Sequence, residues 1–195
     1  MIKNIFILFA PGCGGNHLAN ILSMSKPYQL RSFEQSYNDD QLHGAHPDQL
    51  AGINVPHLKK YLDILINKSN VFCGHWSEYV SVKEHGLLEY FPNRIFCVIQ
   101  IPKIGSKLYN RFLMHNTGMT PWLYHEVTLL YQHMTKLVDG KDTPLLYVCP
   151  DMLTDNSIKT IIDDLNNKGL DLDIDIDEAQ KYHTKWINLN FKKNL

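Results

Sequence analysis

The hydrophobic residues of the chain gather in four short runs that are separated by longer, mixed stretches. Each run is nearly continuous and is bounded by Gly, Pro or Asn, a pattern typical of strands buried on both faces of a parallel sheet. The pattern predicts strands at residues 5–9, 70–73, 94–99 and 145–149.

Stretches in which apolar residues recur with helical spacing lie between and after these runs. They predict helices at residues 18–24, 55–66, from about 104 onward, 124–138, 157–166 and 178–191. Strands that alternate with helices form βαβ units with right-handed crossovers. The sequence therefore predicts an α/β fold with a three-layer, doubly wound and mainly parallel sheet, in a single domain over residues 1–195.

One segment, residues 27–53, breaks the alternation because it is polar and rich in Gln, Ser, Asn, Asp and His. Long loops in compact domains are often functional. We expect this segment to form an excursion over the strand ends and to line the entrance of a substrate-binding site.

Composition and charge narrow the choice of partners. The chain has 44% apolar and 20% charged residues, which are the values of an ordinary globular protein. Its formal net charge is −1, with no long block of one sign. Neither nucleic acid nor an anionic membrane is therefore an expected partner, and any bound anion must be held by local groups.

The cysteines point to a reducing compartment. The chain has four, widely spaced and without a C-x-x-C pair, so neither a zinc site nor a disulfide is expected. The first apolar run is too short for a signal peptide or a membrane span. We expect a cytoplasmic protein.

The candidate functional residues follow the predicted strands, because ligands of such sheets bind outside the carboxyl ends of the strands. The loop after the first run reads PGCGGNH. Its glycines allow positive φ angles, and the helix start adds N–H groups and a positive dipole end. The loop predicts an anion nest that needs no side-chain charge, formed by Pro11, Gly12, Cys13, Gly14, Gly15, Asn16 and His17.

This loop matches neither G-x-x-x-x-G-K-[ST] nor G-x-G-x-x-G. A plain turn from strand to helix is the alternative interpretation. After the second run, His75 is a candidate general base, since an imidazole titrates near neutral pH; a capping or core histidine is the alternative. After the third run, Lys103, Ser106 and Arg111 are candidate anion ligands.

The order of these pieces resembles the PAPS-dependent sulfotransferases, a branch of the P-loop nucleotide-triphosphate-hydrolase-like fold. PGCGGNH stands where that family has P-K-S-G-T-T-W, which grips the 5′-phosphosulfate. CGHWS puts His75 at the catalytic histidine of K-T-H-L-P, and QIPKIGSKL keeps Pro102 of R-x-P-x-D-x-x-x-S. LLYVCPDML is similar to the family's LFLFYEDM, and YHTKWINLN is similar to the C-terminal helix of bacterial members.

Four departures from the family fall on the residues that stabilise the bridging oxygen or recognise the 3′-phosphate. Gly12 replaces the loop lysine, and Cys73 replaces the lysine before the catalytic histidine. Gln100 and Leu108 replace the arginine and the serine that hold the 3′-phosphate.

The resemblance implies an enzyme that moves a sulfuryl group from PAPS (3′-phosphoadenosine 5′-phosphosulfate) to a hydroxyl or amine of a small-molecule or glycan acceptor, without a metal. His75 would deprotonate the acceptor, and a protonated His17 would replace the missing lysine as a donor to the bridging oxygen. Lys103, Ser106 and Arg111 would bind the 3′-phosphate from displaced positions. The alternatives are a non-catalytic ligand-binding protein with the P-loop fold, or a different P-loop enzyme such as a kinase or nucleotide hydrolase.

Overall fold

The computed structural model describes residues 4–10, 12–26, 28–30, 62–63, 66–67, 69–75, 83–115, 125, 128–129, 132, 145–154 and 157–191. The strands are β1 (Asn4–Phe9), β2 (Tyr28–Leu30), β3 (Ser69–His75), β4 (Arg94–Ile99) and β5 (Leu145–Val148). The α-helices are α1 (Gly15–Ser23), α4 (Lys107–His115), α6 (Ile158–Asn167) and α7 (Ile176–Phe191), and the 3₁₀ helices are η1 (Leu87–Tyr90) and η2 (Pro150–Thr154).

The five strands form one parallel sheet in the order β2-β3-β1-β4-β5, which confirms the predicted α/β fold. Strand β1 lies at its centre and pairs with β3 on one side and β4 on the other. The chain leaves β1 toward the β2 edge and leaves β4 toward the β5 edge. Such a reversal of direction between neighbouring strands opens a crevice at their carboxyl ends, where ligands of α/β sheets bind.

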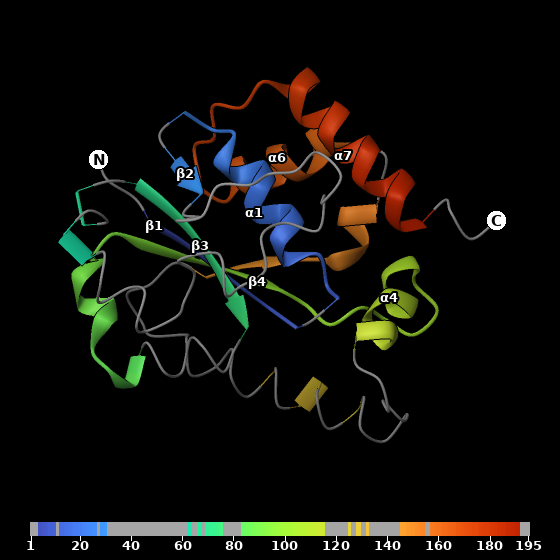
Figure 1. Cartoon of the computed structure of the whole chain (residues 1–195), viewed down its shortest axis with the longest axis horizontal. Coiled ribbons are helices and arrows are strands. Elements are labelled where there is room, and N and C mark those ends of the chain that lie inside the picture. Colours follow the sequence, from blue (N-terminus) through green and yellow to red (C-terminus); the bar gives the residue numbers. More distant parts are fainter. Residues whose placement is uncertain are drawn as a thin grey trace.

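Both faces of the sheet are covered, which explains why the strand sequences are continuously apolar. Helices α1, α6 and α7 lie over one face (Figure 1), and Ile5 and Ile7 of β1 belong to the core packed there. On the other face Phe6 contacts the rings of Phe72, Phe91 and Phe96, with ring centroids 4.8, 5.9 and 5.5 Å apart. Phe91 directly follows η1, so this short helix brings an aromatic side chain over the second face.

The predicted strands agree with the observed ones to within two residues, but two element boundaries need correction. Helix α4 begins at Lys107 rather than near residue 104, because Gly105 has a φ of +84° and the chain turns there, with the Ser106 N–H donating to the Lys103 carbonyl oxygen at 3.0 Å. Helix α1 begins at Gly15, earlier than expected, because Gly14 in the left-handed conformation forms its N-cap without a side-chain bond.

The polar segment 27–53 was expected to be a long excursion over the strand ends, and its first residues form a strand that the sequence did not predict. Residues Tyr28–Leu30 form β2, which pairs with β3. A strand of three residues is too short to show a recognisable pattern of hydrophobic residues in the sequence. The rest of the segment lies outside the described residues, as do most of the predicted helices 55–66 and 124–138, of which residues 62–63, 125, 128–129 and 132 are helical. The extent of the single domain stays a prediction.

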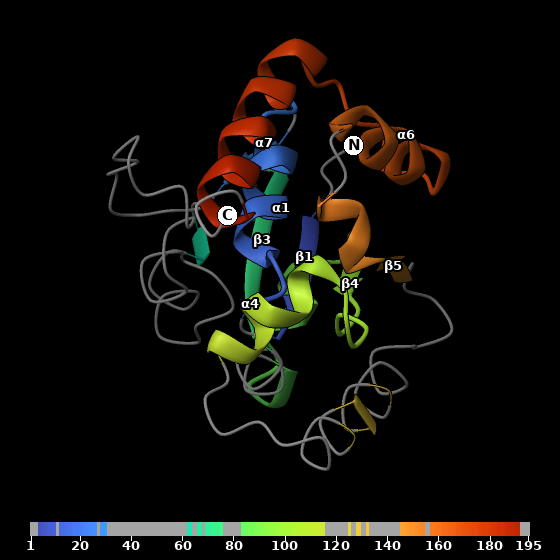
Figure 2. The ribbon, with the colours of Figure 1, turned by 90° about the vertical axis from the view of Figure 1, so that its right-hand side faces the viewer.

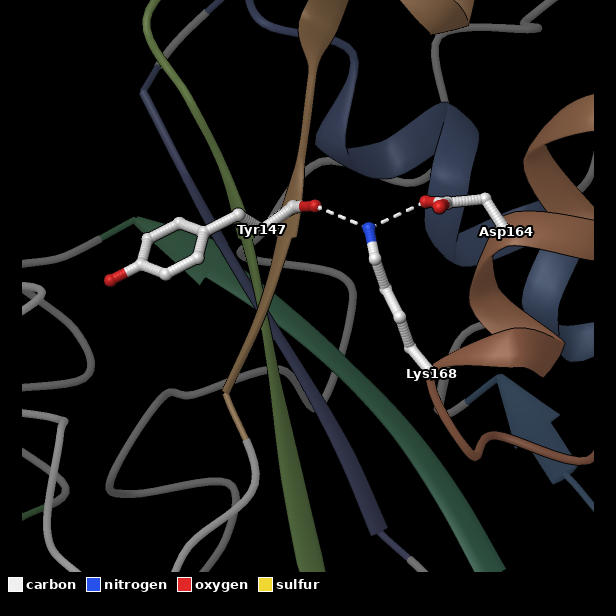
Figure 3. Close-up of polar contacts among 3 residues, drawn as sticks. All are labelled: Tyr147, Asp164 and Lys168. Atoms are coloured by element: carbon white, nitrogen blue, oxygen red, sulfur yellow. Dashed lines mark hydrogen bonds and ion pairs between the residues drawn. The ribbon is translucent and has the colours of Figure 1, made fainter.

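Strand β5 forms one edge of the sheet, and Lys168 covers part of it. The Lys168 Nζ donates to the carbonyl oxygen of Tyr147 at 3.1 Å and to Asp164 Oδ2 at 2.6 Å. Figure 3 shows the Tyr147 ring pointing away from this contact. A lysine bound to an edge carbonyl disfavours the addition of another strand.

Candidate anion site at the carboxyl edge of the sheet

The glycine loop connects the central strand to α1. Gly12 and Gly14 have φ angles of +83° and +82°, which side-chain-bearing residues adopt at a cost. The Cys13 N–H donates to the Ala10 carbonyl oxygen at 3.1 Å, and the Leu18 N–H donates to the Gly14 carbonyl oxygen at 3.0 Å. The hydrogen bonds within α1 therefore begin at the Leu18 N–H, and the N–H groups before it in the first turn have no acceptor within the helix. Pro11, also predicted for this site, lies outside the described residues.

Close packing, as well as conformation, requires glycine in this loop. A Cβ on Gly15 would lie 2.0 Å from the nearest ring atom of Phe9, so α1 can approach β1 only without a side chain there. A Cβ on Gly14 would lie 3.1 Å from Leu153 Cδ1 and 3.6 Å from Trp186. The loop is thus held between β1, η2 and α7.

His17 lies in the core and does not face a ligand as a charged group. Its side chain is 1% exposed, its Nε2 is 2.8 Å from His183 Nδ1, and its ring stacks on Trp186. Burial, with smaller contributions from the charges of His183 and Arg111, lowers the pKa of His17 well below 6.5. Desolvation favours the neutral imidazole, so these surroundings do not favour the protonated state on which the predicted donor role of the His17 side chain depends. Its backbone N–H remains part of the first turn of α1.

Helix α7 supplies the groups that fix this end of α1, and the sequence did not reveal this role. The Tyr182 hydroxyl oxygen accepts a hydrogen bond from Asn20 Nδ2 at 2.6 Å. Tyr182, His183, Trp186 and Asn190 recur at spacings of three and four, which places them on adjoining parts of one helix surface. This mixed polar and aromatic stripe is the signal from which a site-supporting role could have been proposed.

Arg111 of α4 lies beside the same stripe. Its Nη1 donates to Asn190 Oδ1 at 2.9 Å, and its guanidinium carbon is 5.4 Å from the centroid of the Trp186 ring. Trp186, which lies beside Gly14, is the side chain that connects Arg111 with the glycine loop. Figure 2 faces this edge of the sheet and shows α1, α4 and α7 around the strand ends.

Cys13 contributes no charge to the loop. Burial raises the pKa of its thiol to about 12, which outweighs the opposing effects of the Ala10 backbone and the Arg111 charge. A thiol in this state is neutral and a poor nucleophile. A covalent role for Cys13 is therefore not supported.

The other predicted residues follow the two strands next to β1. The backbone of His75 ends β3 and is in register with Phe9, directly before the loop, while its side chain lies outside the described part. Lys103 is exposed on the turn after β4. Ser106 precedes α4, and its Oγ is buried without a hydrogen-bond partner among the described residues. Their candidacy as ligands stays a prediction.

The described residues contain no group of three or more His, Cys, Asp or Glu side chains arranged to hold a metal ion. None of the helices in this part of the chain is both long and apolar enough to cross a membrane.

Comparison with known proteins supports the fold. No protein-family model matches the sequence, and no curated protein matches it. Among solved structures, the chain is similar to the sulfotransferase STF1 of Mycobacterium tuberculosis H37Rv, with a TM-score of 0.50 and 11% identity over 99% of this chain and 77% of that one. A gluconokinase of Sinorhizobium meliloti 1021 matches with a TM-score of 0.37 and 13% identity, over 99% of this chain and 98% of that one. The similarity to the sulfotransferase structure agrees with the α/β fold of this chain.

Proposed function

We propose that the protein is a sulfotransferase that moves a sulfuryl group from PAPS to a hydroxyl or amine of a small-molecule or glycan acceptor. The observation that carries this proposal is the glycine loop, which presents the first turn of α1 at the carboxyl end of the central strand. The fold-level likeness to a sulfotransferase supports it by analogy.

The groups at this edge of the sheet suit a sulfuryl donor that carries phosphates at the 3′ and 5′ positions of its ribose. Gly14 and Gly15 allow the loop to pack closely against Phe9, Leu153 and Trp186, which holds the first turn of α1 at the end of β1, where its N–H groups are the proposed donors to an anion. The buried Oγ of Ser106 and the buried Nε of Arg111 have no hydrogen-bond partner among the described residues. Buried polar groups of this kind are normally satisfied, so a ligand is a natural partner for them.

In the proposed reaction, PAPS supplies an activated sulfuryl group whose bond to the bridging phosphate oxygen breaks as the acceptor oxygen or nitrogen bonds to sulfur. His75 takes the acceptor's proton. The N–H groups at residues 14–17, with the positive end of the α1 dipole, stabilise the charge left on the phosphate. Lys103 and Ser106, on the turn after β4, are the proposed ligands of the 3′-phosphate.

Thermal denaturation with adenosine 3′,5′-bisphosphate tests the binding part of the proposal. A ligand that binds only the native state at 100 times its Kd adds about 2.7 kcal/mol to the free energy of unfolding. We expect a clear rise in Tm with the bisphosphate. No shift at millimolar concentration would contradict the proposal, and a shift with ATP and magnesium alone would favour a kinase.

The catalytic part is tested with His75→Ala, assayed by transfer of labelled sulfate from PAPS to a panel of acceptors. Loss of a general base lowers the rate by about 10²- to 10⁴-fold, while bisphosphate binding should persist. His85, an exposed histidine after β3, gives the matched control His85→Ala. Unchanged transfer in His75→Ala would remove His75 from the mechanism, and a wild-type protein that binds without transferring to any acceptor would be a ligand-binding protein.

A further inference from the structure

Arg111 is a partly desolvated cation for which the described part of the chain offers no anionic partner. Burial lowers its pKa below the ordinary arginine value, and the opposing effect comes from Cys13 rather than from a carboxylate. No ion pair between Arg111 and an Asp or Glu occurs among the described residues, and its Nε is buried and unsatisfied there. Cations removed from water are normally paired with an anion.

The groups that surround this cation are neutral. The buried thiol of Cys13 and the buried imidazole of His17 both carry no charge near neutral pH. The other contacts of Arg111 among the described residues are the Asn190 side-chain oxygen at 2.9 Å and the Trp186 ring at 5.4 Å. Within this part of the chain no negative charge balances the guanidinium, and a bound anion would do so.

The same tryptophan connects Arg111 with the glycine loop. Trp186 lies 3.6 Å from the position of a Cβ on Gly14, and it also stacks on His17 in the first turn of α1. Arg111, the loop and the start of α1 therefore converge on one side chain of α7. The loop has backbone donors but no cation of its own, and α4 brings one to it.

We infer that Arg111 supplies the positive charge for the anion bound at the glycine loop, and that Asn190 and Trp186 are the residues that position it. For the nucleotide this inference rests on the proposed function, and it assigns Arg111 to the 5′-phosphosulfate instead of the 3′-phosphate expected from the sequence. A planar guanidinium held over an indole ring by a side-chain amide is pre-oriented, so less freedom is lost when it binds two oxygens of an anion.

Calorimetric titration of Arg111→Gln tests the assignment with three probes. Adenosine 5′-phosphosulfate and inorganic pyrophosphate carry anions for the loop, and adenosine 3′-monophosphate does not carry a 5′-anion. Loss of a charge-assisted hydrogen bond weakens binding by about 10- to 100-fold. We expect this loss for the first two probes and an unchanged Kd for the 3′-monophosphate. Lys107, exposed on the same helix, provides the charge-matched control Lys107→Gln, which should leave all three unchanged.

Asn190→Asp is a second variant that keeps Arg111 in place. A carboxylate at this position would pair with the guanidinium and compete with the anion. We expect weaker binding of both loop anions, by about the same factor as in Arg111→Gln, while the Tm of the ligand-free protein does not fall. A merely structural role for Asn190 predicts a lower Tm and no specific loss of the 5′-anion.

The outcomes separate this inference from the proposed function. Wild-type protein that binds pyrophosphate in an Arg111-dependent manner but binds no adenosine ligand would support Arg111 as the anion ligand and contradict the sulfotransferase proposal. Adenosine 5′-phosphosulfate that binds wild type and Arg111→Gln equally would overturn the inference and leave the proposed function standing. A loss of affinity confined to adenosine 3′-monophosphate would show that Arg111 binds the 3′-phosphate, and this result would also overturn the inference.

Discussion

The imidazole of His17 lies flat on the indole of Trp186, with ring centroids 3.9 Å apart and ring planes 3° apart. One ring belongs to the first turn of α1, and the other belongs to the last helix of the chain. The contact makes the glycine loop depend on α7, because Trp186 also lies against Gly14. The C-terminal helix is thus a structural support of the candidate site.

Removal of the Trp186 side chain should therefore destabilise the protein and disturb the loop. Trp186 is 1% exposed, and the truncation of a buried tryptophan to alanine costs about 3–5 kcal/mol. We expect this loss for Trp186→Ala in urea unfolding. Tyr90→Ala, at an aromatic residue that is 52% exposed, is the control and should cost much less. Equal losses in the two variants would show that the stack does not hold the loop.

The buried His17 should make stability fall in mild acid. Its pKa in the folded protein is below the ordinary value of 6.5. As the pH falls, His17 is therefore protonated in the unfolded chain before it is protonated in the folded protein. Its contribution to stability is present above about pH 6.5 and is lost as pH falls below it, by at most about 1.4 kcal/mol per pH unit. Urea unfolding between pH 7 and pH 5 should show a shallower slope in His17→Phe than in wild type. Parallel slopes would mean that His17 has the same pKa in the folded and the unfolded protein, which would contradict the shift.

Gly15→Ala should be destabilising, although glycine-to-alanine changes inside a helix normally stabilise it by about 1 kcal/mol. The new Cβ would meet the Phe9 ring at 2.0 Å, and overpacking of a core costs about 1–3 kcal/mol. Chemical unfolding measures the sign directly. In a Phe9→Leu background the penalty should shrink, since the smaller side chain gives way; an unchanged penalty would place its cause elsewhere.

Cys13 and Cys97 should resist alkylation in the native protein. Burial raises the pKa of each thiol to about 12, so neither forms appreciable thiolate at pH 8. Iodoacetamide labelling followed by peptide mass spectrometry should find both unmodified until denaturant is added. Rapid native labelling of Cys13 would show that the loop opens far more readily than its packing indicates.

The sequence predicted the sheet well because the strands are buried on both faces. Residues 94–99 were predicted to be a strand and form β4 over that range. The short β2 escaped prediction because three residues at a sheet edge carry no period. At the site, Gly12, Gly14 and Gly15 were predicted from the positive φ angles that glycine adopts readily. Gly12 and Gly14 have such angles, whereas Gly15 is helical and is required by its close approach to Phe9.

The contacts of α7 with the loop were beyond the sequence. His17 was interpreted from its position at a helix start, where a charged donor is useful, but its ring turns toward His183 and Trp186. Such contacts join residues far apart in the chain, and no local spacing encodes them. Arg111 was found as a cation, whereas its place beside the loop depends on the packing of α4 against α7.

The central claim is that backbone N–H groups of the glycine loop hold the anion, and amide chemical shifts measure this most directly. Adenosine 3′,5′-bisphosphate should be titrated into the ¹⁵N-labelled protein while ¹H–¹⁵N spectra are recorded. The account predicts that the largest amide shifts fall on Gly14, Gly15, Asn16 and His17, at the start of α1. Binding with unperturbed amides at these four positions, or no binding at all, would contradict it.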